Sequence, residues 1–447
     1  MDADADSEYE YSDGSLEATQ SEVEESVRRL NDTSNLTPKQ LKMIQYVKDV
    51  YASGARIWTK ESLRSIESDL AKDPCPEEIM VRSSKSSRLT PPSPFLCLAS
   101  SGGHSDNRSY KSRLGFTPKP PSTRRTIKRA SITAPGTQHL VYGELWNFIT
   151  DSEIRRTSVN FNTYQDLLNL AKNISSGDQD EEEFKEHEPL PEKDQIRVTR
   201  ALNLGESRQS YYIDNISEYS VLKCIWDETW GNWTKSKVCK ELADTIAGMA
   251  HVTPTIDKVV CFGLGTFSKL PRPGSGGEED KSEADGLPLR RPMIQHAAAL
   301  TMATEFGKRV GKGPLKVFTQ DPAYTDTEKQ VLRDAGIEVL GGIGSLGFTY
   351  VDDDTLVFSI SPNIPVRQVV ADIARPAAMV WCTVQPAGVG TPKWRAEEFD
   401  GKWYCVDPWT TDPDSPRTRE LVDGYAVYKF PHDEERFSDP TIYVRSD

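Results

Sequence analysis

Past residue 255, hydrophobic residues occur in two alternating patterns. Continuous apolar runs of strand length are separated by segments whose apolar residues recur every three to four positions, as in "PVRQVVADIA" at 365–374. Strands that are buried on both faces read as continuous hydrophobic runs, and their alternation with helices is typical of a parallel sheet. We therefore expect an α/β fold, a Rossmann-like three-layer domain with a mostly parallel sheet. The predicted strands lie in "KVVCFGLG" at 258–265, which ends in a glycine turn, in "LKVFTQDPAY" at 315–324, where the strand ends at Asp321, and at 337–340, 355–363 and 377–384.

The chain before residue 200 has weaker patterns. In "TPKQLKMIQYVKDVYASGARIW" one helical face carries Leu41, Ile44, Val47, Val50 and Tyr51. A helix this short needs a surface to dock on. The remaining stretches are acidic or rich in Pro and Ser, which favours disorder. The expected order is a disordered acidic tail at 1–36, a short helical segment at 37–73, a disordered Pro/Ser/basic linker at 74–139, a short helical segment at 140–175, an acidic linker at 176–199, the α/β domain at 200–430 with a flexible acidic insertion at 270–291, and a C-terminal tail at 431–447.

Composition and charge narrow the functional classes. Hydrophobic residues make up 36% of the chain, and the formal net charge is −14, which argues against nucleic acid and anionic membranes as partners. The seven cysteines form no CxxC pair and the six histidines have no metal-ligand spacing, so we expect reduced thiols and no metal site. No secretory signal or membrane span is predicted. We expect a soluble protein of the cytoplasm, the nucleus or both, with other proteins as partners.

The candidate binding site is built around "VVCFGLGTFS" at 259–268. Gly263 and Gly265 end the first predicted strand, as a dinucleotide-binding turn does, and Asp321 ends the second, where a ribose-binding acid stands. Ligands of parallel sheets bind beyond the carboxyl ends of the strands, where Ser361 and Asn363 also belong. The expected ligand-binding residues are Gly263, Gly265, Thr266, Ser268, Asp321, Ser361 and Asn363, with an unknown cofactor.

A structural turn is the competing interpretation. The third position of a G-x-G-x-x-G fingerprint is here Ser268, and the acidic insertion at 270–291 delays the helix whose amides would bind phosphate. The chain contains no GxSxG elbow, P-loop or HExxH motif, and we expect His296 to be a packing residue. The basic run at 108–129, which ends just before Ser131, is either an import or docking patch with a kinase site or a solvated charge run.

Three segments together resemble a known family. "VVCFGLGTFS", "VFTQDPAYTDTEKQVLRDAGIEVL" and "TLVFSISPN" are similar to the SRR-like domain family, named for Sensitivity to Red Light Reduced, over roughly residues 215–385. The long inserts resemble those of a filamentous-fungal member. The resemblance implies regulatory roles, in light and circadian signalling, haem-biosynthesis control or the cytoskeleton. It implies no established reaction, so no catalytic residue is carried over.

Two main hypotheses remain open. The first is a non-enzymatic regulatory protein whose α/β domain is a protein-docking or ligand-sensing platform, the sensed ligand being a nucleotide or haem. The second is a Rossmann-like enzyme, such as an S-adenosylmethionine- or nucleotide-dependent transferase, since methyl-transfer sites also place a polar Pro-containing loop after the fourth strand. "SISPN" at 359–363 is such a loop.

Overall fold

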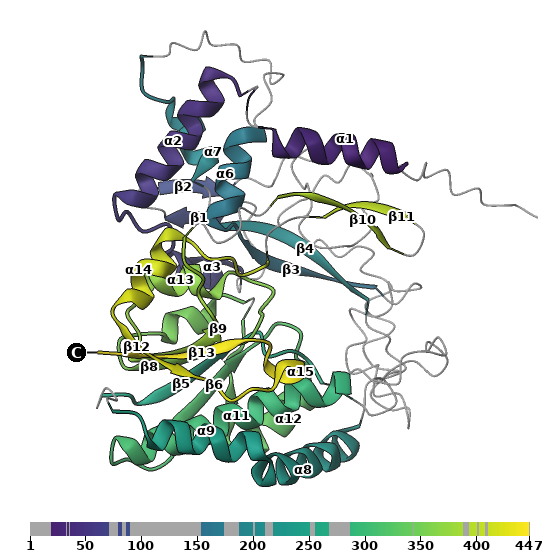
Figure 1. The fold of residues 1–447 in the computed structure, drawn as a ribbon, viewed down its shortest axis with the longest axis vertical. Coiled ribbons are helices and arrows are strands. Elements are labelled where there is room, and N and C mark those ends of the chain that lie inside the picture. The colour runs from purple at the N-terminus through teal and green to yellow at the C-terminus, as the bar shows by residue number, and fades with distance from the viewer. Residues whose placement is uncertain are drawn as a thin grey trace, which may run out of the picture. The chain divides into compact units, whose positions relative to one another are not determined.

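The computed structural model places about two thirds of the chain. It comprises two compact units, one within residues 1–37 and 388–410 and the other within 38–387 and 411–447 (Figure 1). Ser268, Ser131 and the basic run at 108–129 lie outside the described residues. The described residues are 19–32, 34, 36–70, 79–82, 86–89, 153–173, 187–199, 202–210, 218–250, 255–267, 287–342, 344–387, 393–399, 402–406 and 410–446.

A seven-stranded sheet organises the larger unit. Its order is β12-β13-β9-β8-β5-β6-β7, and the five predicted strands run parallel to one another. The sheet confirms the predicted α/β class with a mostly parallel sheet. The strands are β5 (Lys258–Phe262), β6 (Lys316–Gln320), β7 (Ile337–Val339), β8 (Thr355–Ser359), β9 (Ala378–Cys382), β12 (Tyr425–Lys429) and β13 (Pro440–Arg445).

The C-terminal residues differ from the expected tail at 431–447. Strand β13 lies antiparallel between β9 and β12, and residues 440–444 are all buried. The short helix α15 (Glu434–Phe437) precedes it. Six residues at a chain end carry little periodicity, and the partner strand β9 lies far upstream in the sequence. Pairing at such a separation is decided by the packed sheet.

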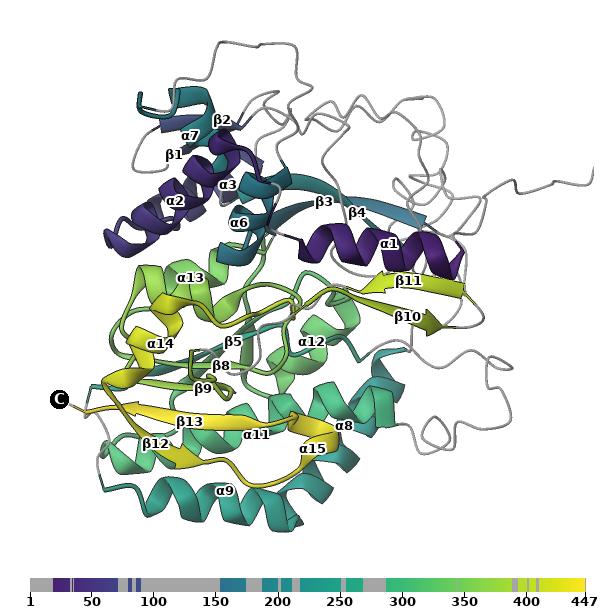
Figure 2. The same ribbon diagram turned by 45° about the horizontal axis from the view of Figure 1, so that its top comes forward.

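One face of the sheet is covered by helices from neighbouring chain segments (Figures 1 and 2). The inner helices are α11 (Leu287–Arg309) and α12 (Asp326–Asp334), and α8 (Tyr219–Lys235) and α9 (Lys237–Ala247) pack beside α11. Small side chains such as Ala297 and Ala298 let α11 lie close to Val259 and Cys261. A capping box of Thr325 and Glu328 starts α12. Helix α11 begins at Leu287, within the expected insertion at 270–291.

The opposite face has a shorter crossover. Helix α13 (Val366–Ile373) connects β8 to β9, but only the 3-10 helix η3 (Leu346–Tyr350) connects β7 to β8. Phe348 of η3 stacks on Phe262 with ring centroids 4.4 Å apart, and Phe161 meets Phe348 edge-on at 5.5 Å. Helix α3 (Lys60–Leu70) packs against η3. Segments far upstream therefore complete this side of the core.

We call these upstream elements the N-terminal layer: α2 (Pro38–Ala52), α3, the hairpin of β3 (Glu153–Phe161) and β4 (Leu202–Ser210), α6 (Tyr164–Asn173) and α7 (Glu192–Val198). The expected boundaries at 140–175, 176–199 and 200 cut through this layer, because β4 pairs with β3 across them. The predicted α2 is present, but Leu41 is 54% exposed. Val47 and Tyr51 are buried as expected, and Met43 is the third buried residue of the helix. The strands β1 (Ile79–Arg82) and β2 (Ser86–Leu89) form a separate hairpin.

A buried ion pair between α13 and α14 (Pro416–Asp423) also binds the N-terminal layer through backbone hydrogen bonds. The Asp372 carboxylate accepts hydrogen bonds from the amides of Ile57 and Trp58, at 2.7 and 3.1 Å, and from Arg417 at 2.5 Å. Arg417 also donates to the last carbonyls of α2, including that of Tyr51, and covers the Tyr51 ring at 4.1 Å. One carboxylate and one guanidinium thus connect three helices.

The smaller unit consists of α1 (Gln20–Asn31) and the hairpin of β10 (Arg395–Phe399) and β11 (Lys402–Val406). Helix α1 lies inside the segment 1–36 that we expected to be disordered. A capping box of Thr19 and Glu22 starts it, and Glu25 pairs with Arg28 and Arg29. Asn31 exchanges two hydrogen bonds with the backbone of Trp394. The helix ends on a partner that is 363 residues away, which local composition does not reveal.

Candidate functional site

The carboxyl edge of the parallel strands brings most of the sequence-predicted residues together. The chain leaves β5 toward β6 over one face and leaves β8 toward β9 over the other, so β5 and β8 flank the topological switch point of the sheet. A Cβ atom added to Gly263 would lie 2.9 Å from Cβ of Pro362. The loop after β5 therefore lies directly against the loop that carries Ser361 and Asn363.

Both glycines of the first loop have conformations that favour glycine. Gly263 has φ +61° and Gly265 has φ +89°, in the region where a side chain meets its own backbone. A Cβ on Gly265 would also lie 3.3 Å from Pro292 of α11. The glycine pattern thus has a complete structural explanation, which is the competing interpretation that the sequence left open.

Asp321 holds this loop in place. Its carboxylate accepts a hydrogen bond from the Gly265 amide at 3.0 Å and from the Ala323 amide at 2.9 Å. The sequence suggested Asp321 as a ribose-binding acid. In the structure the side chain connects the turn after β6 to the loop after β5, so a ligand reaching it would have to share oxygens that already bind backbone amides.

Glu328 fastens the other end of the same loop. The side chain is fully buried, accepts a hydrogen bond from the Thr266 hydroxyl at 2.7 Å, and accepts another from the Phe267 amide. Its second oxygen accepts from the Thr325 amide at 2.6 Å. The Thr266 hydroxyl, expected as a ligand donor, is therefore used to anchor the loop on α12.

His296 lies beneath this loop in a closed hydrogen-bond chain. Its Nδ1–H donates to the Pro292 carbonyl at 2.7 Å, and its Nε2 accepts from the Tyr324 hydroxyl at 2.7 Å. Tyr324 in turn accepts from Thr319 at 2.9 Å. Burial lowers the pKa of His296 to about 4, against a smaller opposite effect of the Pro292 carbonyl. The ring is a neutral packing residue, as the sequence indicated.

Around Ser361 of the second loop lie three residues that the sequence did not indicate, Cys382, Ser438 and Arg291. Ser361 is exposed, and its hydroxyl lies 3.5 Å from Sγ of Cys382 and 3.4 Å from the hydroxyl of Ser438. Arg291 of α11 approaches Ser438 with Nη2 at 3.4 Å. Asn363 is exposed beside them. Ser438 comes from the expected C-terminal tail, so only the position of β13 brings it here.

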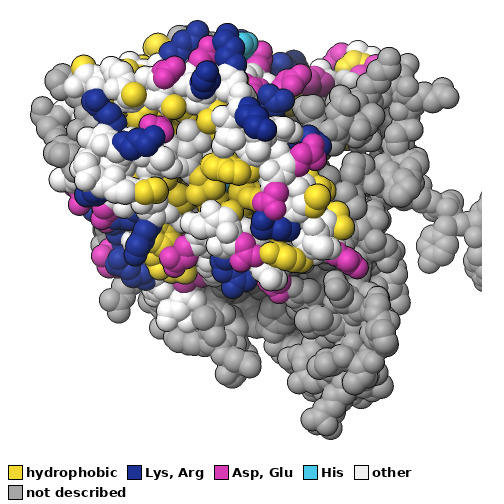
Figure 3. Space-filling view, turned by 90° about the horizontal axis from the view of Figure 1, so that it is seen from below, with side chains coloured by type: hydrophobic (Ala, Val, Ile, Leu, Met, Phe, Trp, Pro, Cys, Tyr) yellow, Lys and Arg dark blue, Asp and Glu magenta, His cyan; other side chains and the backbone are white. Residues whose placement is uncertain are grey.

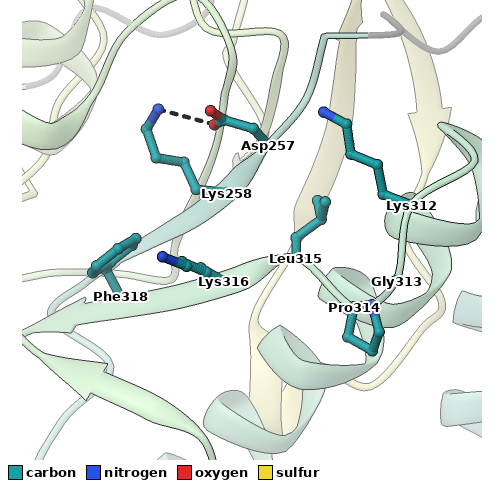
Figure 4. Close-up of a pocket in the computed structure, with 8 residues that line it drawn as sticks. All are labelled: Asp257, Lys258, Lys312, Gly313, Pro314, Leu315, Lys316 and Phe318. Carbon is teal, nitrogen blue, oxygen red and sulfur yellow. Dashed lines mark hydrogen bonds and ion pairs between the residues drawn. The ribbon is translucent and has the colours of Figure 1, made fainter.

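A shallow hollow lies at the opposite, amino edge of the sheet (Figure 4). Its volume is about 410 Å³, and Lys258, Lys312, Lys316 and Phe318 are among its lining residues. Lys258 forms ion pairs of 2.9 Å with both Asp257 and Asp352. Desolvation lowers the pKa of Lys258, but these two pairs outweigh it and leave the pKa above its ordinary value. The charge of Lys258 is thus neutralised by two carboxylates, and the hollow is shallow, so no binding site is assigned to it.

The described residues contain no group of three His, Cys, Asp or Glu side chains placed to hold a metal ion. Among the same residues, none of the helices combines the length and the apolar character that crossing a bilayer requires.

Comparison with known proteins identifies one domain. Residues 238–383 match the family model of the SRR1 domain. The match runs from α9 to the end of β9 and includes the loops after β5, β6 and β8. The N-terminal layer, β12 and β13 lie outside it. Neither the comparison with curated proteins nor the comparison with solved structures gave a match.

Proposed function

We propose that this protein, whose residues 238–383 form an SRR-like domain, is a non-enzymatic regulatory protein that uses the α/β domain as a protein-docking or ligand-sensing platform. The proposal rests on one observation: the carboxylates beside the strand-end loops accept hydrogen bonds from backbone amides of those loops. Asp321, Glu328 and Glu67 each bind backbone amides of the strand-end loops, and so maintain the shape of the surface.

Glu67 shows the same arrangement at the third strand end. It comes from α3, and one of its oxygens accepts from the amides of Ser345 and Leu346 at 2.8 Å and from the Ser345 hydroxyl at 2.9 Å. The N-terminal layer thereby orients the start of η3. A general acid or base must reach the proton that it transfers, whereas these carboxylates point into the loops. Such pre-ordered loops favour recognition.

The outer side of α8 and α9 offers a second surface for a partner. Figure 3 shows the molecule from this side, with hydrophobic side chains between interspersed Lys, Arg, Asp and Glu side chains. Val221 of α8 is 44% exposed. Apolar groups rimmed by charges of both signs are typical of protein-binding surfaces. This arrangement supports proteins as the partners. The cytoplasm, the nucleus or both remain the proposed compartment from the sequence alone.

The test uses the full chain with S-adenosylmethionine, nucleotides and haem. A sensor is stabilised by its ligand and leaves it unchanged, and a ligand at about 100 times its Kd adds about 2.7 kcal/mol to the free energy of unfolding. Thermal unfolding and chromatography of the incubated ligand measure the two effects. Stabilisation without conversion supports a sensor. Conversion of any ligand into product contradicts the proposal.

A second candidate is an S-adenosylmethionine- or nucleotide-dependent transferase. The switch point between β5 and β8 favours it, because the 263–265 loop and the polar loop at 361–363 meet where open α/β sheets bind ligands. Gly265→Val introduces a branched side chain at φ +89° against Pro292 and displaces this loop. Turnover in the wild type that is lost in Gly265→Val, with folding retained in circular dichroism, supports the transferase.

A further inference from the structure

We propose that Arg291, Ser361 and Ser438 form a subsite for the phosphoryl group of a small phosphorylated ligand. The proposal rests on the ligand-sensing form of the proposed function and names the class of ligand. It starts from the meeting of two serines from distant loops. Ser361 follows β8 and Ser438 precedes β13, yet their hydroxyl oxygens are 3.4 Å apart.

The backbone of both serines is unusual. Ser361 has φ +46°, and Ser438 has φ +60° with ψ −128°. Within the part of the chain that the structure describes, these are the two residues other than glycine with positive φ. Glycine adopts such conformations without the steric cost that serine carries. A serine at both positions, with the hydroxyls facing each other, indicates that the hydroxyls themselves are needed.

Arg291 supplies the positive charge. It lies near the start of α11, and its Nη2 is 3.4 Å from the Ser438 hydroxyl. Among the described residues no carboxylate pairs with Arg291, whereas the adjacent Arg290 pairs with Glu228 at 3.2 Å. Arg291 is half-buried, which limits screening of its charge. The next residue, Pro292, contacts Gly265, so the guanidinium group belongs to the switch-point edge.

The donor set fits a phosphoryl group. A phosphate monoester carries nearly two negative charges and three strong acceptor oxygens. One guanidinium and two hydroxyls can donate to them together, and hydrogen bonds to a charged group are the strong ones. The Cys382 thiol, at 3.5 Å, orients the Ser361 hydroxyl. The nearby Asp321 carboxylate is directed to the Gly265 and Ala323 amides, and the Asp439 side chain is exposed.

The experiment measures thermal unfolding of the full chain against inorganic phosphate and AMP, with chloride and acetate at matched ionic strength. The variants are Arg291→Gln and its neighbour Arg290→Gln as control. We expect phosphate and AMP to raise the Tm of the wild type and of Arg290→Gln equally. Arg291→Gln should weaken the apparent affinity at least tenfold, because it removes the only cation of the subsite.

Glycine substitutions separate binding from folding. Ser361→Gly and Ser438→Gly relieve the backbone strain, so we expect a higher Tm without ligand and a weaker response to phosphate. A response to phosphate that is equal in the wild type and Arg291→Gln overturns the subsite, and so does an equal response to acetate.

The same assays distinguish the subsite from the function on which it rests. If haem or S-adenosylmethionine stabilises the chain without turnover while phosphate and AMP do not, the subsite is wrong and the sensor stands. If AMP binds through Arg291 and is converted into product, the subsite stands and the non-enzymatic function is wrong.

Discussion

The two faces of the seven-stranded sheet are covered in different ways. On one face, α11 and α12 follow β5 and β6 along the chain, and their contacts are mainly apolar, apart from the buried hydrogen bonds of His296 and Glu328. On the other face, the short η3 leaves room that α3, α2 and β3 fill from 38–70 and 153–161, with buried ion pairs at the contact. A domain defined by residues 238–383 therefore includes the cover of one face and lacks much of the other. The N-terminal layer belongs to the same core.

The largest effect should come from the buried Arg367. Its guanidinium pairs with Asp412 at 3.1 Å and with Asp414 at 2.6 Å, and all three side chains are nearly inaccessible. Arg367→Met leaves two carboxylates without their cation, so we expect a loss of about 3–5 kcal/mol in the free energy of unfolding, measured with urea. Arg419→Met, a more exposed arginine of α14 that binds one backbone carbonyl, is the control and should cost under about 1 kcal/mol. Equal losses in the two variants would show that the buried ion pairs of Arg367 contribute no more to the free energy of unfolding than an exposed hydrogen bond.

Two buried leucines, one on each side of the sheet, test whether the N-terminal layer and the helices of the opposite face unfold together as one cooperative unit. Leu63 of α3 and Leu332 of α12 are both fully buried, the first in the N-terminal layer and the second within the SRR1 domain. Each change to alanine should cost about 2–5 kcal/mol through lost burial and the cavity left behind. Chemical denaturation with circular dichroism measures both. If Leu63→Ala has no effect on unfolding of the sheet, the N-terminal layer is a separate unit.

The two faces should also respond oppositely to pH. His296 on the first face has a pKa of about 4, below the ordinary 6.5, because it is buried. The unfolded chain therefore binds more protons between pH 4 and 6.5, and this contribution to stability is lost as the pH falls through that window. Burial raises the pKa of Asp412 on the second face to about 6, although Arg367 lies beside it. Its contribution is lost as the pH rises from about 4 to 6.

Substitutions separate these opposing slopes. Asp412→Asn should make the free energy of unfolding rise more steeply with pH between 4 and 6, and His296→Gln should flatten or reverse that rise. At about 1.4 kcal/mol for each pH unit between the ordinary and the altered pKa, the contribution is at most about 3.5 kcal/mol for His296 and about 3 kcal/mol for Asp412. Denaturant titrations at several pH values measure it. Identical pH profiles for the wild type and both variants would contradict the assignment.

The smallest effect compares two glycines with positive φ. Gly336 ends α12 with φ +86° and open space around it, whereas a Cβ on Gly263 would lie 2.9 Å from Pro362. Gly336→Ala should cost about 1 kcal/mol for the left-handed backbone alone, and Gly263→Ala should cost more, because the two strand-end loops must separate. Thermal unfolding of the two variants gives the difference. Equal losses of stability in the two variants would mean that the loops after β5 and β8 can separate without a cost in free energy.

The local patterns of the chain predicted a large part of this architecture. The strand "VVCF" and the apolar face of α13 are local signals, and both elements formed where they were expected. The capping box of Thr325 and Glu328 that starts α12 is also a local signal. The placement of Gly263, Asp321 and Ser361 at one edge followed from parallel strands alone. The ligand-binding roles of these residues stay predictions, and the structure gives Asp321 and Thr266 additional roles in holding the loop.

What the residues alone determined is the alternation of strands and helices, because hydrophobic period and capping depend on neighbours within a few positions. Tertiary structure decided which segments complete the sheet and its second face, because pairing across hundreds of residues depends on surfaces that exist only after the core has formed. Strand β13, the contact of α3 with η3, and the meeting of Ser361 with Ser438 are all of this second kind. Strand β13 and Ser438 come from the segment that was expected to be a C-terminal tail.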